Sequence, residues 1–327
     1  MKEIELWKFI DEELISSCKV ILMVVAESSK SSPGRAGFKM AISSDNKLAG
    51  TVGGGIMEHK LLEECKQHFE TGYKINSVKK LFHNKTSPGE KSGLICGGSE
   101  TIILKSLDKN DENFVSKIIA NYNNLKCGSL IINQTGISFD ESGMQSQKII
   151  FNYKSENDWY YQEEAGQPNT VYIIGGGHVG LAVSKVLSTQ DFYVVTIDPR
   201  KDVFTMANNT YANKKLFIPY AEVGNHIIEG DRSYGVIVTS EHDTDLAALR
   251  SIINKKLKYI GLMGSKAKIK SIYNKLIEQG IDPGLLKKVY TPIGIEIEAE
   301  SPDEIGISIA AEIIKVKNEK HTRHINE

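Results

Sequence analysis

The sequence predicts an α/β fold in which a C-terminal, Rossmann-like parallel-sheet domain follows a smaller, mixed α/β N-terminal domain. Three observations lead to this prediction. From Val171 onward, strand-like and helix-like runs alternate regularly, which is typical of a parallel sheet covered by helices on both faces. Before that point the alternation is irregular and strands dominate. The chain has 327 residues, 40% of them hydrophobic and 25% charged, which suits two ordinary domains.

The first half opens with a predicted helix over residues 3–17, where apolar residues recur at helical spacing. A β-rich run over 19–28 leads into a polar loop over 28–37, which contains proline and two glycines. Later elements are predicted in this order: a strand at 38–43, a glycine turn at 50–55, a helix at 56–70, a strand at 75–83, a loop at 84–98, a strand at 100–107, a helix at 111–125, and strands at 128–133 and 147–153.

The run SENDWYYQEEAGQPN at 155–169 is polar and turn-rich, so we expect a linker there. The predicted domains therefore span 1–160 and 168–318, with a flexible tail at 319–327. In the second domain, strands are predicted at 171–175, 193–198, 234–240 and 258–263, and helices near 179–190, 244–255, 266–279 and 302–317. The two histidines of the tail are attributed to a loose terminus and not to a metal site.

Composition excludes several classes of function. The net charge is −1, so no global field attracts the protein to nucleic acid or to an acidic membrane. The first residues lack the apolar core of a signal peptide, and no apolar run approaches the ~20 residues needed to span a bilayer. We therefore expect a cytoplasmic protein. The four cysteines form no C-x-x-C pair and are expected to be thiols.

The stretch VYIIGGGHVGLAVSKVL has the pattern of a dinucleotide-binding turn. Gly175 permits a tight turn from strand to helix, Gly177 lets the backbone approach a pyrophosphate, and Gly180 lets the helix pack closely on the strand. Asp198 ends the next strand, where a carboxylate can bind ribose hydroxyls. The helix N-terminus offers free N–H groups to an anion. The sequence therefore predicts a nucleotide-like ligand.

Four further residues are candidates for ligand contacts in this half. His178 either caps the helix or contacts the phosphate, and Arg200 is either a solvated charge or a phosphate ligand. His242 follows a strand at the carboxyl edge of the sheet, where open α/β sheets bind ligands; there, helix capping by its neighbours is the alternative. Ser265 lies in GLMGSK, another turn before a helix that could hold an anion. The Walker A spacing is missing, so ATP hydrolysis is not expected.

The first half contains two more glycine-rich stretches, which end the loops before a helix and a strand. In GTVGGGIMEHK, Gly53, Gly54 and Gly55 precede the helix, and Glu58 falls in its first turn. Glu58 either stabilises the helix dipole or contacts a ligand. In LICGGSE, Cys96 is followed by Gly97 and Gly98, which leave room for a ligand and can expose amides that lower the pKa of a thiol.

Taken together, these stretches resemble the XdhC/CoxI family, the accessory proteins of molybdenum hydroxylases such as xanthine dehydrogenase. The resemblance covers nearly the whole chain. It rests on the stretches SSPGRAGFKMAI, GTVGGGIMEHKLLEE, LICGGSETIIL, IIGGGHVGLAVSKVL, VVTIDPRKDVF, TSEHDTDLAAL, YIGLMGSKAKIKSI and PIGIEIEAESPDEIGISIAAEII.

The resemblance implies a protein that binds molybdenum cofactor (molybdopterin), supports its sulfuration by a cysteine desulfurase, and inserts it into a xanthine dehydrogenase-type hydroxylase. It implies a maturation factor and not a stand-alone enzyme. Cys96 would be the catalytic residue and metal ligand, since soft sulfur suits such metals. The sequence departs from many relatives in having Ile95 before Cys96 and Gly55 where some have cysteine, which puts a dithiol mechanism in doubt.

Two other functions remain open. The glycine turn and Asp198 are compatible with an NAD(P)-dependent oxidoreductase, although no acid–base pair for hydride transfer is evident. A sensor that binds a nucleotide without catalysis would use the same fold and the same thiol. For any of these functions we expect a homodimer on base rates alone. We also expect the two glycine sites to face each other across a cleft and share one ligand.

Overall fold

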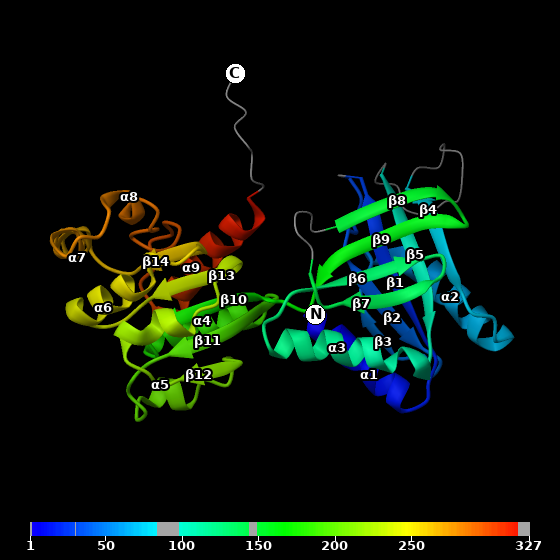
Figure 1. The fold of residues 1–327 in the computed structure, drawn as a ribbon, viewed down its shortest axis with the longest axis horizontal. Helices are drawn as coiled ribbons and strands as arrows, with labels where there is room; N and C mark the ends of the chain where they lie inside the picture. The colour runs from blue at the N-terminus through cyan, green and yellow to red at the C-terminus, as the bar shows by residue number, and fades with distance from the viewer. Residues whose placement is uncertain (1, 30, 84–97, 144–148, 320–327) are drawn as a thin grey trace, which may run out of the picture. The chain divides into compact units, whose positions relative to one another are not determined.

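The computed structural model describes residues 2–29, 31–83, 98–143 and 149–319, and it divides the chain into two compact units. Unit 1 covers 1–167 and unit 2 covers 168–327 (Figure 1). Among the described residues, no helix is both long enough and apolar enough to cross a membrane.

Unit 1 is built on a five-stranded antiparallel sheet with the strand order β3-β2-β1-β5-β4. A second antiparallel sheet has the order β7-β6-β9-β8. The elements in chain order are α1 (Glu3–Ile15), β1 (Val20–Ser28), β2 (Lys39–Ser43), β3 (Leu48–Gly50), α2 (Gly55–Thr71), β4 (Asn76–Phe82), β5 (Ser99–Leu107), α3 (Glu112–Asn123), β6 (Gly128–Asn133), β7 (Gly136–Asp140), β8 (Ile149–Ser155) and β9 (Asp158–Ala165).

The strand β1 is apolar almost throughout because both of its faces are covered. Its even-numbered residues, such as Leu22 and Val24, pack in a core with α1, α3 and the second sheet. Its odd-numbered residues, such as Ile21 and Met23, pack against α2. A strand buried on both faces reads as a continuous hydrophobic run, as VILMVVA does here.

Unit 2 contains a five-stranded parallel sheet with the order β12-β11-β10-β13-β14. Helices α4 and α9 pack on one face, and α6, α7 and α8 pack on the other. The elements are β10 (Asn169–Ile174), α4 (His178–Ser188), β11 (Phe192–Ile197), α5 (Phe204–Ala207), β12 (Lys214–Leu216), β13 (Gly230–Ile237), α6 (His242–Ile252), β14 (Leu257–Leu262), α7 (Lys266–Glu278), α8 (Pro283–Leu286) and α9 (Pro302–Asn318). The predicted Rossmann-like parallel sheet is confirmed.

The linker expected at 155–169 is wrong, because most of this stretch forms strand β9 between β6 and β8. Trp159, Tyr161 and Ala165 are buried in the core of unit 1. Glu163 is also buried, and its carboxylate lies 2.8 Å from the buried ammonium group of Lys39 on β2. A buried ion pair therefore holds β9 within unit 1, and the boundary between the units follows Gln167.

Candidate functional site

The glycine turn of unit 2 joins the end of β10 to the start of α4. Gly175 has φ +120°, and a Cβ atom there would lie 2.6 Å from the carbonyl oxygen of Val238. A Cβ atom on Gly180 would lie 2.0 Å from the carbonyl oxygen of Gly175. Gly175 is therefore required both by its positive φ and by the nearby Val238 carbonyl. Gly180 is required because the Gly175 carbonyl leaves no room for a side chain. Contact of Gly175 with Val238 also brings the ends of β10 and β13 together.

Gly177 differs from these two glycines. Its φ of −73° is open to any residue, and a Cβ atom there would meet no other atom within 4 Å. His178, the first residue of α4, is exposed. Among the described residues, no atom therefore fills the position that a side chain at Gly177 would take.

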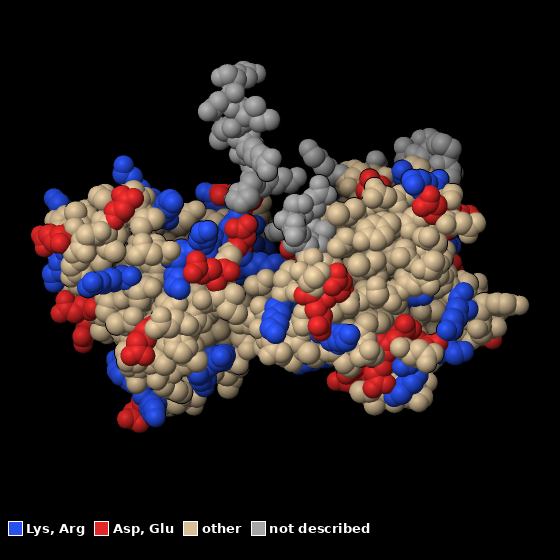
Figure 2. All heavy atoms as spheres, in the orientation of Figure 1, with Lys and Arg blue, Asp and Glu red and all other residues tan. Residues whose placement is uncertain are grey.

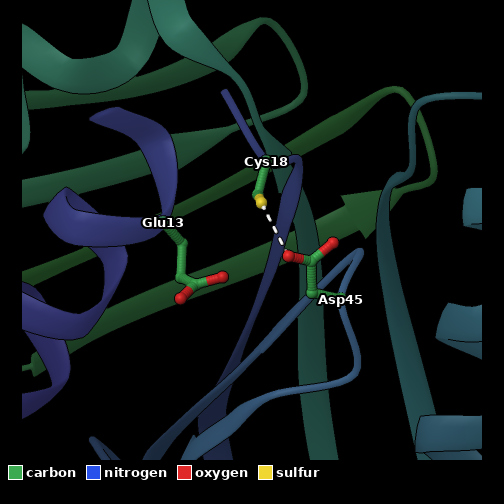
Figure 3. A group of neighbouring side chains, drawn as sticks. All are labelled: Glu13, Cys18 and Asp45. Atoms are coloured by element: carbon green, nitrogen blue, oxygen red, sulfur yellow. Dashed lines mark hydrogen bonds between the residues drawn. The ribbon is translucent and has the colours of Figure 1, made fainter. Parts of the chain in front are cut away.

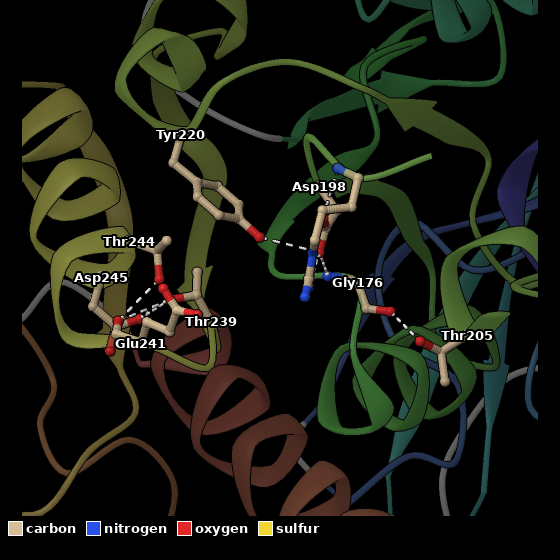
Figure 4. A network of polar contacts seen from close by, with 9 residues as sticks. Gly176, Asp198, Thr205, Tyr220, Thr239, Glu241, Thr244 and Asp245 are labelled. Atoms are coloured by element: carbon tan, nitrogen blue, oxygen red, sulfur yellow. Dashed lines mark hydrogen bonds and ion pairs between the residues drawn. The ribbon is translucent and has the colours of Figure 1, made fainter. Parts of the chain in front are cut away.

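Asp198 lies just after β11 and is fully buried. Its carboxylate accepts hydrogen bonds from the Gly176 amide (2.9 Å), the Tyr220 hydroxyl (3.0 Å), and the backbone amide and guanidinium of Arg200 (2.8–3.0 Å), as Figure 4 shows for Gly176 and Tyr220. Burial alone would raise the pKa of this carboxyl, but the hydrogen bonds from Arg200 and Gly176 lower it to about 2.

The Asp198 carboxylate, which the sequence predicts to bind a ribose, is thus already hydrogen-bonded to groups of the protein. Asp198 fixes the glycine turn through Gly176, and a ribose would have to replace Arg200 to reach it. Arg200 itself is half-exposed, with its side chain 55% accessible. We therefore regard Asp198 as a residue that positions the turn.

A second polar cluster follows β13, beside the glycine turn (Figure 4). Thr239 donates a hydrogen bond to buried Asp245 and lies 2.7 Å, oxygen to oxygen, from the Thr244 hydroxyl. The ammonium group of Lys268 lies 2.6 Å from the Asp245 carboxylate. The sequence alone does not reveal this cluster. Its only signal is the position of TSEHDTD at the carboxyl edge of the sheet.

The remaining candidates of unit 2 lie on the two helices that follow β13 and β14. His242 begins α6; its ring nitrogens lie 3.2 Å from the Asp243 carboxylate and 3.1 Å from the Ser271 hydroxyl of α7. Ser265 caps α7 by accepting a hydrogen bond from the Lys268 amide at 3.3 Å. Both residues have structural partners, and a role in ligand binding stays a prediction for each.

In unit 1 the glycine turn before α2 surrounds the side chain of Glu58. One carboxylate oxygen accepts hydrogen bonds from the amides of Val52 (2.8 Å), Gly53 (3.1 Å) and Gly54 (2.8 Å), and from the Thr51 hydroxyl. Gly55 is the first residue of α2. The carboxylate of Glu58 therefore accepts hydrogen bonds from the amides of this turn itself, and a role in ligand binding stays a prediction for Gly53, Gly54, Gly55 and Glu58.

Three of the glycine-containing stretches of unit 1 meet beside this turn. A Cβ atom on Gly34 would lie 2.3 Å from the Val52 carbonyl and 2.8 Å from a Glu100 oxygen. A Cβ atom on Gly98 would lie 2.5 Å from the Ser29 hydroxyl. The polar loop at 28–37, the turn at 50–55 and the start of β5 are therefore packed together as closely as glycine permits.

A buried acid lies beneath this junction. Glu100 is 1% exposed, accepts a hydrogen bond from the Gly34 amide at 2.8 Å, and lies 3.4 Å from the ring nitrogen of buried His83. The His83 amide donates to the Gly98 carbonyl at 2.8 Å, which brings the end of β4 to the start of β5. The segment 84–97 connects these ends. Cys96 and Gly97, predicted as the thiol site, lie outside the described residues.

Two other cysteines of unit 1 have distinct surroundings. Cys65 is buried on α2, and its burial raises the pKa of the thiol to about 12. Cys18 lies 3.4 Å from Asp45 and near Glu13 (Figure 3), and these three side chains are close enough to hold a cation. The ammonium group of Lys47 already pairs with Glu13 at 2.7 Å, so the chain supplies a cation there itself.

Comparison with known proteins agrees with this architecture. The XdhC Rossmann domain matches residues 171–313, and the XdhC and CoxI family matches residues 16–77. The uncharacterized protein YqeB of Escherichia coli is 23% identical over 92% of this chain. A Bacillus subtilis protein described as a probable xanthine dehydrogenase subunit is 33% identical over 25% of it. The alignments cover 44% and 23% of the lengths of these two relatives.

Among solved structures, a Bacillus halodurans protein described as a xanthine dehydrogenase has the same fold. The TM-score is 0.72 at 19% identity, with 97% of this chain and 96% of the other covered. The two domain matches fall one in each structural unit and in the order expected from the sequence motifs. The chain therefore belongs to the XdhC/CoxI family, with an XdhC Rossmann domain as its second unit.

Proposed function

We propose that this protein is an accessory protein of a xanthine dehydrogenase-type molybdenum hydroxylase. In this proposal it binds molybdenum cofactor, supports sulfuration of the cofactor by a cysteine desulfurase, and inserts it into the hydroxylase. Membership of the XdhC/CoxI family supports the association with such enzymes. The name of the Bacillus subtilis relative, which describes part of a probable xanthine dehydrogenase, points in the same direction.

The single observation that carries the proposal is the open space at Gly177. Packing and backbone conformation require Gly175 and Gly180, but the structure would accept a larger residue at Gly177. Glycine at this position leaves the amides at the start of α4 accessible to a phosphate, which the positive end of the helix dipole attracts. Molybdopterin carries a phosphate and fits this chemistry.

Different residues of the chain would bind different parts of the cofactor. Gly177 and the first turn of α4 would hold the phosphate, while Asp198 would keep the turn in shape through the Gly176 amide. Cys96 would offer a thiolate to the metal, since sulfur is a soft ligand. The cofactor would supply the molybdenum centre that the hydroxylase requires.

The test is to produce the full chain in cells that make molybdenum cofactor and to measure molybdenum and pterin in the purified protein. We expect Gly177→Ala to reduce bound cofactor by about tenfold or more, because the new methyl group stands where the phosphate approaches. Gly136→Ala is the matched control, since a Cβ atom at Gly136 also meets nothing within 4 Å but lies on β7, outside the site. Cys96→Ser tests the thiol.

Two results would contradict the proposal. One is a wild-type protein that holds neither molybdenum nor pterin under these conditions. The other is tight binding of NADH in calorimetry together with hydride transfer to a substrate, which would favour the NAD(P)-dependent oxidoreductase. Unchanged cofactor content in Gly177→Ala would show that the glycine turn does not bind the cofactor. Unchanged cofactor content and unchanged sulfuration in Cys96→Ser would show that the Cys96 thiol takes no part in binding or sulfuration.

A further inference from the structure

Unit 1 has a pocket at one end of the core that lies between its two sheets. The pocket has a volume of about 380 Å³, within the range of roughly 300–1,000 Å³ that is usual for small-molecule sites. One wall comes from β1, β4 and β5 of the first sheet, and the other from β8 of the second sheet (Figure 1). The lining residues are Glu27, Val78, Lys80, Thr101, Phe151 and Tyr153. Val78 and Phe151 also pack against the core between the sheets, so the pocket continues that core toward the surface.

An irregularity in β1 brings an acid to the first wall. The pairing of β1 with β5 shifts between Val25 and Glu27, where Ala26 is the extra residue. Without the shift, Glu27 would follow the odd-numbered residues of β1 onto the face that α2 covers. With it, Glu27 pairs with Thr101, which shares a face with Ile103 of the core between the sheets. Bulges of this kind redirect side chains and are common beside functional sites.

Three polar side chains form a row across this wall. Thr101 pairs with Glu27 on one side and with Lys80 on the other. Neighbouring strands lie roughly 4.8 Å apart, so a carboxylate, a hydroxyl and an ammonium group follow one another over roughly 10 Å. In the part of the chain that the structure describes, no hydrogen bond or ion pair involves the side chain of Glu27 or Thr101. The Lys80 ammonium group lies 5.7 Å from the centre of the Phe82 ring. The row is therefore available to a ligand.

The opposite wall is aromatic. Phe151 and Tyr153 are alternate residues of β8, so their side chains point to the same face of the second sheet. They pair with Tyr161 and Trp159 of β9, which are buried in the core between the sheets. Phe151 is partly buried, whereas 47% of Tyr153 is exposed. A flat ring can therefore stack on these side chains while its edge reaches the polar row.

Net charge does not select a ligand for this pocket. Acidic and basic side chains are mixed over the visible face of unit 1 (Figure 2). The pocket itself offers one acid, Glu27, and one base, Lys80. Selectivity must therefore come from the order of the groups in the row, in which an acceptor is followed by the Thr101 hydroxyl and then by a donor. A matching ligand edge presents its donors first and its acceptors after them.

We propose that this pocket binds the aminopyrimidinone edge of a pterin ring, in which an amino group, a ring N–H and an oxo group follow one another. The Glu27 carboxylate would accept two parallel hydrogen bonds from the amino group and the ring N–H. The Thr101 hydroxyl and the Lys80 ammonium group would donate to the oxo group and to the ring nitrogen beyond it. Guanine carries the same edge, and the choice of pterin rests on the proposed function, because molybdopterin contains a pterin.

The test uses the full chain, produced in cells that do not make molybdenum cofactor. It measures binding of pterin and of lumazine by titrating the fluorescence of each ring at slightly acidic pH, where both rings are uncharged. Lumazine has an oxo group in place of the amino group and so presents an acceptor to Glu27. The variants are Glu27→Gln and Tyr153→Ala. Their matched controls are Glu70→Gln and Tyr73→Ala, two exposed residues of unit 1 that do not line the pocket.

We expect the wild-type protein to bind pterin about tenfold or more tightly than lumazine. Glu27→Gln should abolish this preference, because a neutral amide can donate to the oxo group of lumazine as well as accept from the amino group of pterin. Tyr153→Ala should weaken binding of both rings alike, by about fivefold or more, because each loses the same stacking surface. The two control variants should bind both rings as the wild-type protein does.

Three results would overturn the proposal: equal binding of pterin and lumazine by the wild-type protein, an unchanged preference in Glu27→Gln, or no binding of either ring. Guanosine is added as a competitor, and displacement of pterin by guanosine at equal concentration would overturn the choice of pterin in favour of a guanine nucleotide. The molybdenum and pterin content of the purified protein tests the proposed function separately. A protein that carries the cofactor but shows no preference for pterin over lumazine would contradict the assignment of this pocket alone.

Discussion

At the scale of single residues, Asp198 shows how one carboxylate can determine the shape of a glycine turn. It accepts hydrogen bonds from Gly176, Arg200 and Tyr220, and none of its surface is exposed to solvent. Its position after β11 could be predicted from the spacing of the glycine motif. Its partners could not, because Tyr220 comes 22 residues later, at the start of a short 3-10 helix (Tyr220–His226) that no periodic pattern in the sequence predicts.

Asp198 should contribute stability that depends on pH. Its pKa is about 2 in the folded protein, below the ordinary value of 3.8, so the ionised form favours folding. That contribution is fully present above about pH 4 and is lost as the pH falls through about 2. We expect Asp198→Asn to reduce the free energy of unfolding by about 2 kcal/mol at neutral pH. The difference from wild type should shrink as the pH is lowered from about 5 to about 2.

Urea unfolding at several pH values measures this difference. Asp202→Asn is the matched control, because Asp202 is an exposed acid only four residues away. Its substitution should change stability by less than about 0.5 kcal/mol at every pH. A constant difference between Asp198→Asn and wild type across this range would show that ionisation of Asp198 does not favour folding.

At the scale of elements, regular strands and long helices could be predicted, and short or atypical strands could not. β3 and β12 have only three residues each, too few for a period to be visible. β9 was hidden for another reason. It alternates buried and partly exposed residues, but charged Glu163 occupies one of the buried positions. Glu163 can be buried there because its carboxylate pairs with the ammonium group of Lys39, which lies 124 positions earlier in the sequence.

The junction between β10 and α4 allows a prediction at this scale. A methyl group on Gly180 would lie 2.0 Å from the Gly175 carbonyl, so the helix must move away from the strand. We expect Gly180→Ala to lower the free energy of unfolding by about 1–3 kcal/mol. Gly177→Ala, in the same turn but facing open space, should change it by less than about 1 kcal/mol. Calorimetry of both variants makes the comparison, and equal stability would contradict the close packing at Gly180.

At the scale of the whole molecule, each unit has its own hydrophobic cores. The clusters around β1 belong to unit 1, and those around β10 and β13 belong to unit 2. The existence of two domains could be predicted from the change in strand–helix alternation. The position of the boundary could not, because the polar composition of β9 is that of a linker even though the strand is built into unit 1.

The boundary can be tested with two fragments of the first unit. We expect the fragment 1–167 to unfold cooperatively, because it retains β9 and the pairing of Glu163 with Lys39. The fragment 1–160 removes Tyr161, Glu163 and Ala165 from the core and leaves the Lys39 ammonium without one of its carboxylates. It should lose about 3–5 kcal/mol from the ion pair alone. Denaturant unfolding followed by circular dichroism distinguishes the fragments. Equal unfolding midpoints for the two fragments would show that the first domain ends at residue 160.

The carboxylate of Glu58 has a consequence for the kind of ligand that each glycine turn could bind. It gives the turn before α2 an anion of its own, held by three successive amides. A phosphate arriving there would be repelled by the Glu58 carboxylate and would find the amides already hydrogen-bonded, whereas a Cβ atom at Gly177 would meet no other atom within 4 Å. We therefore propose that, of the two glycine turns, the one before α4 accepts an anion and the one before α2 does not.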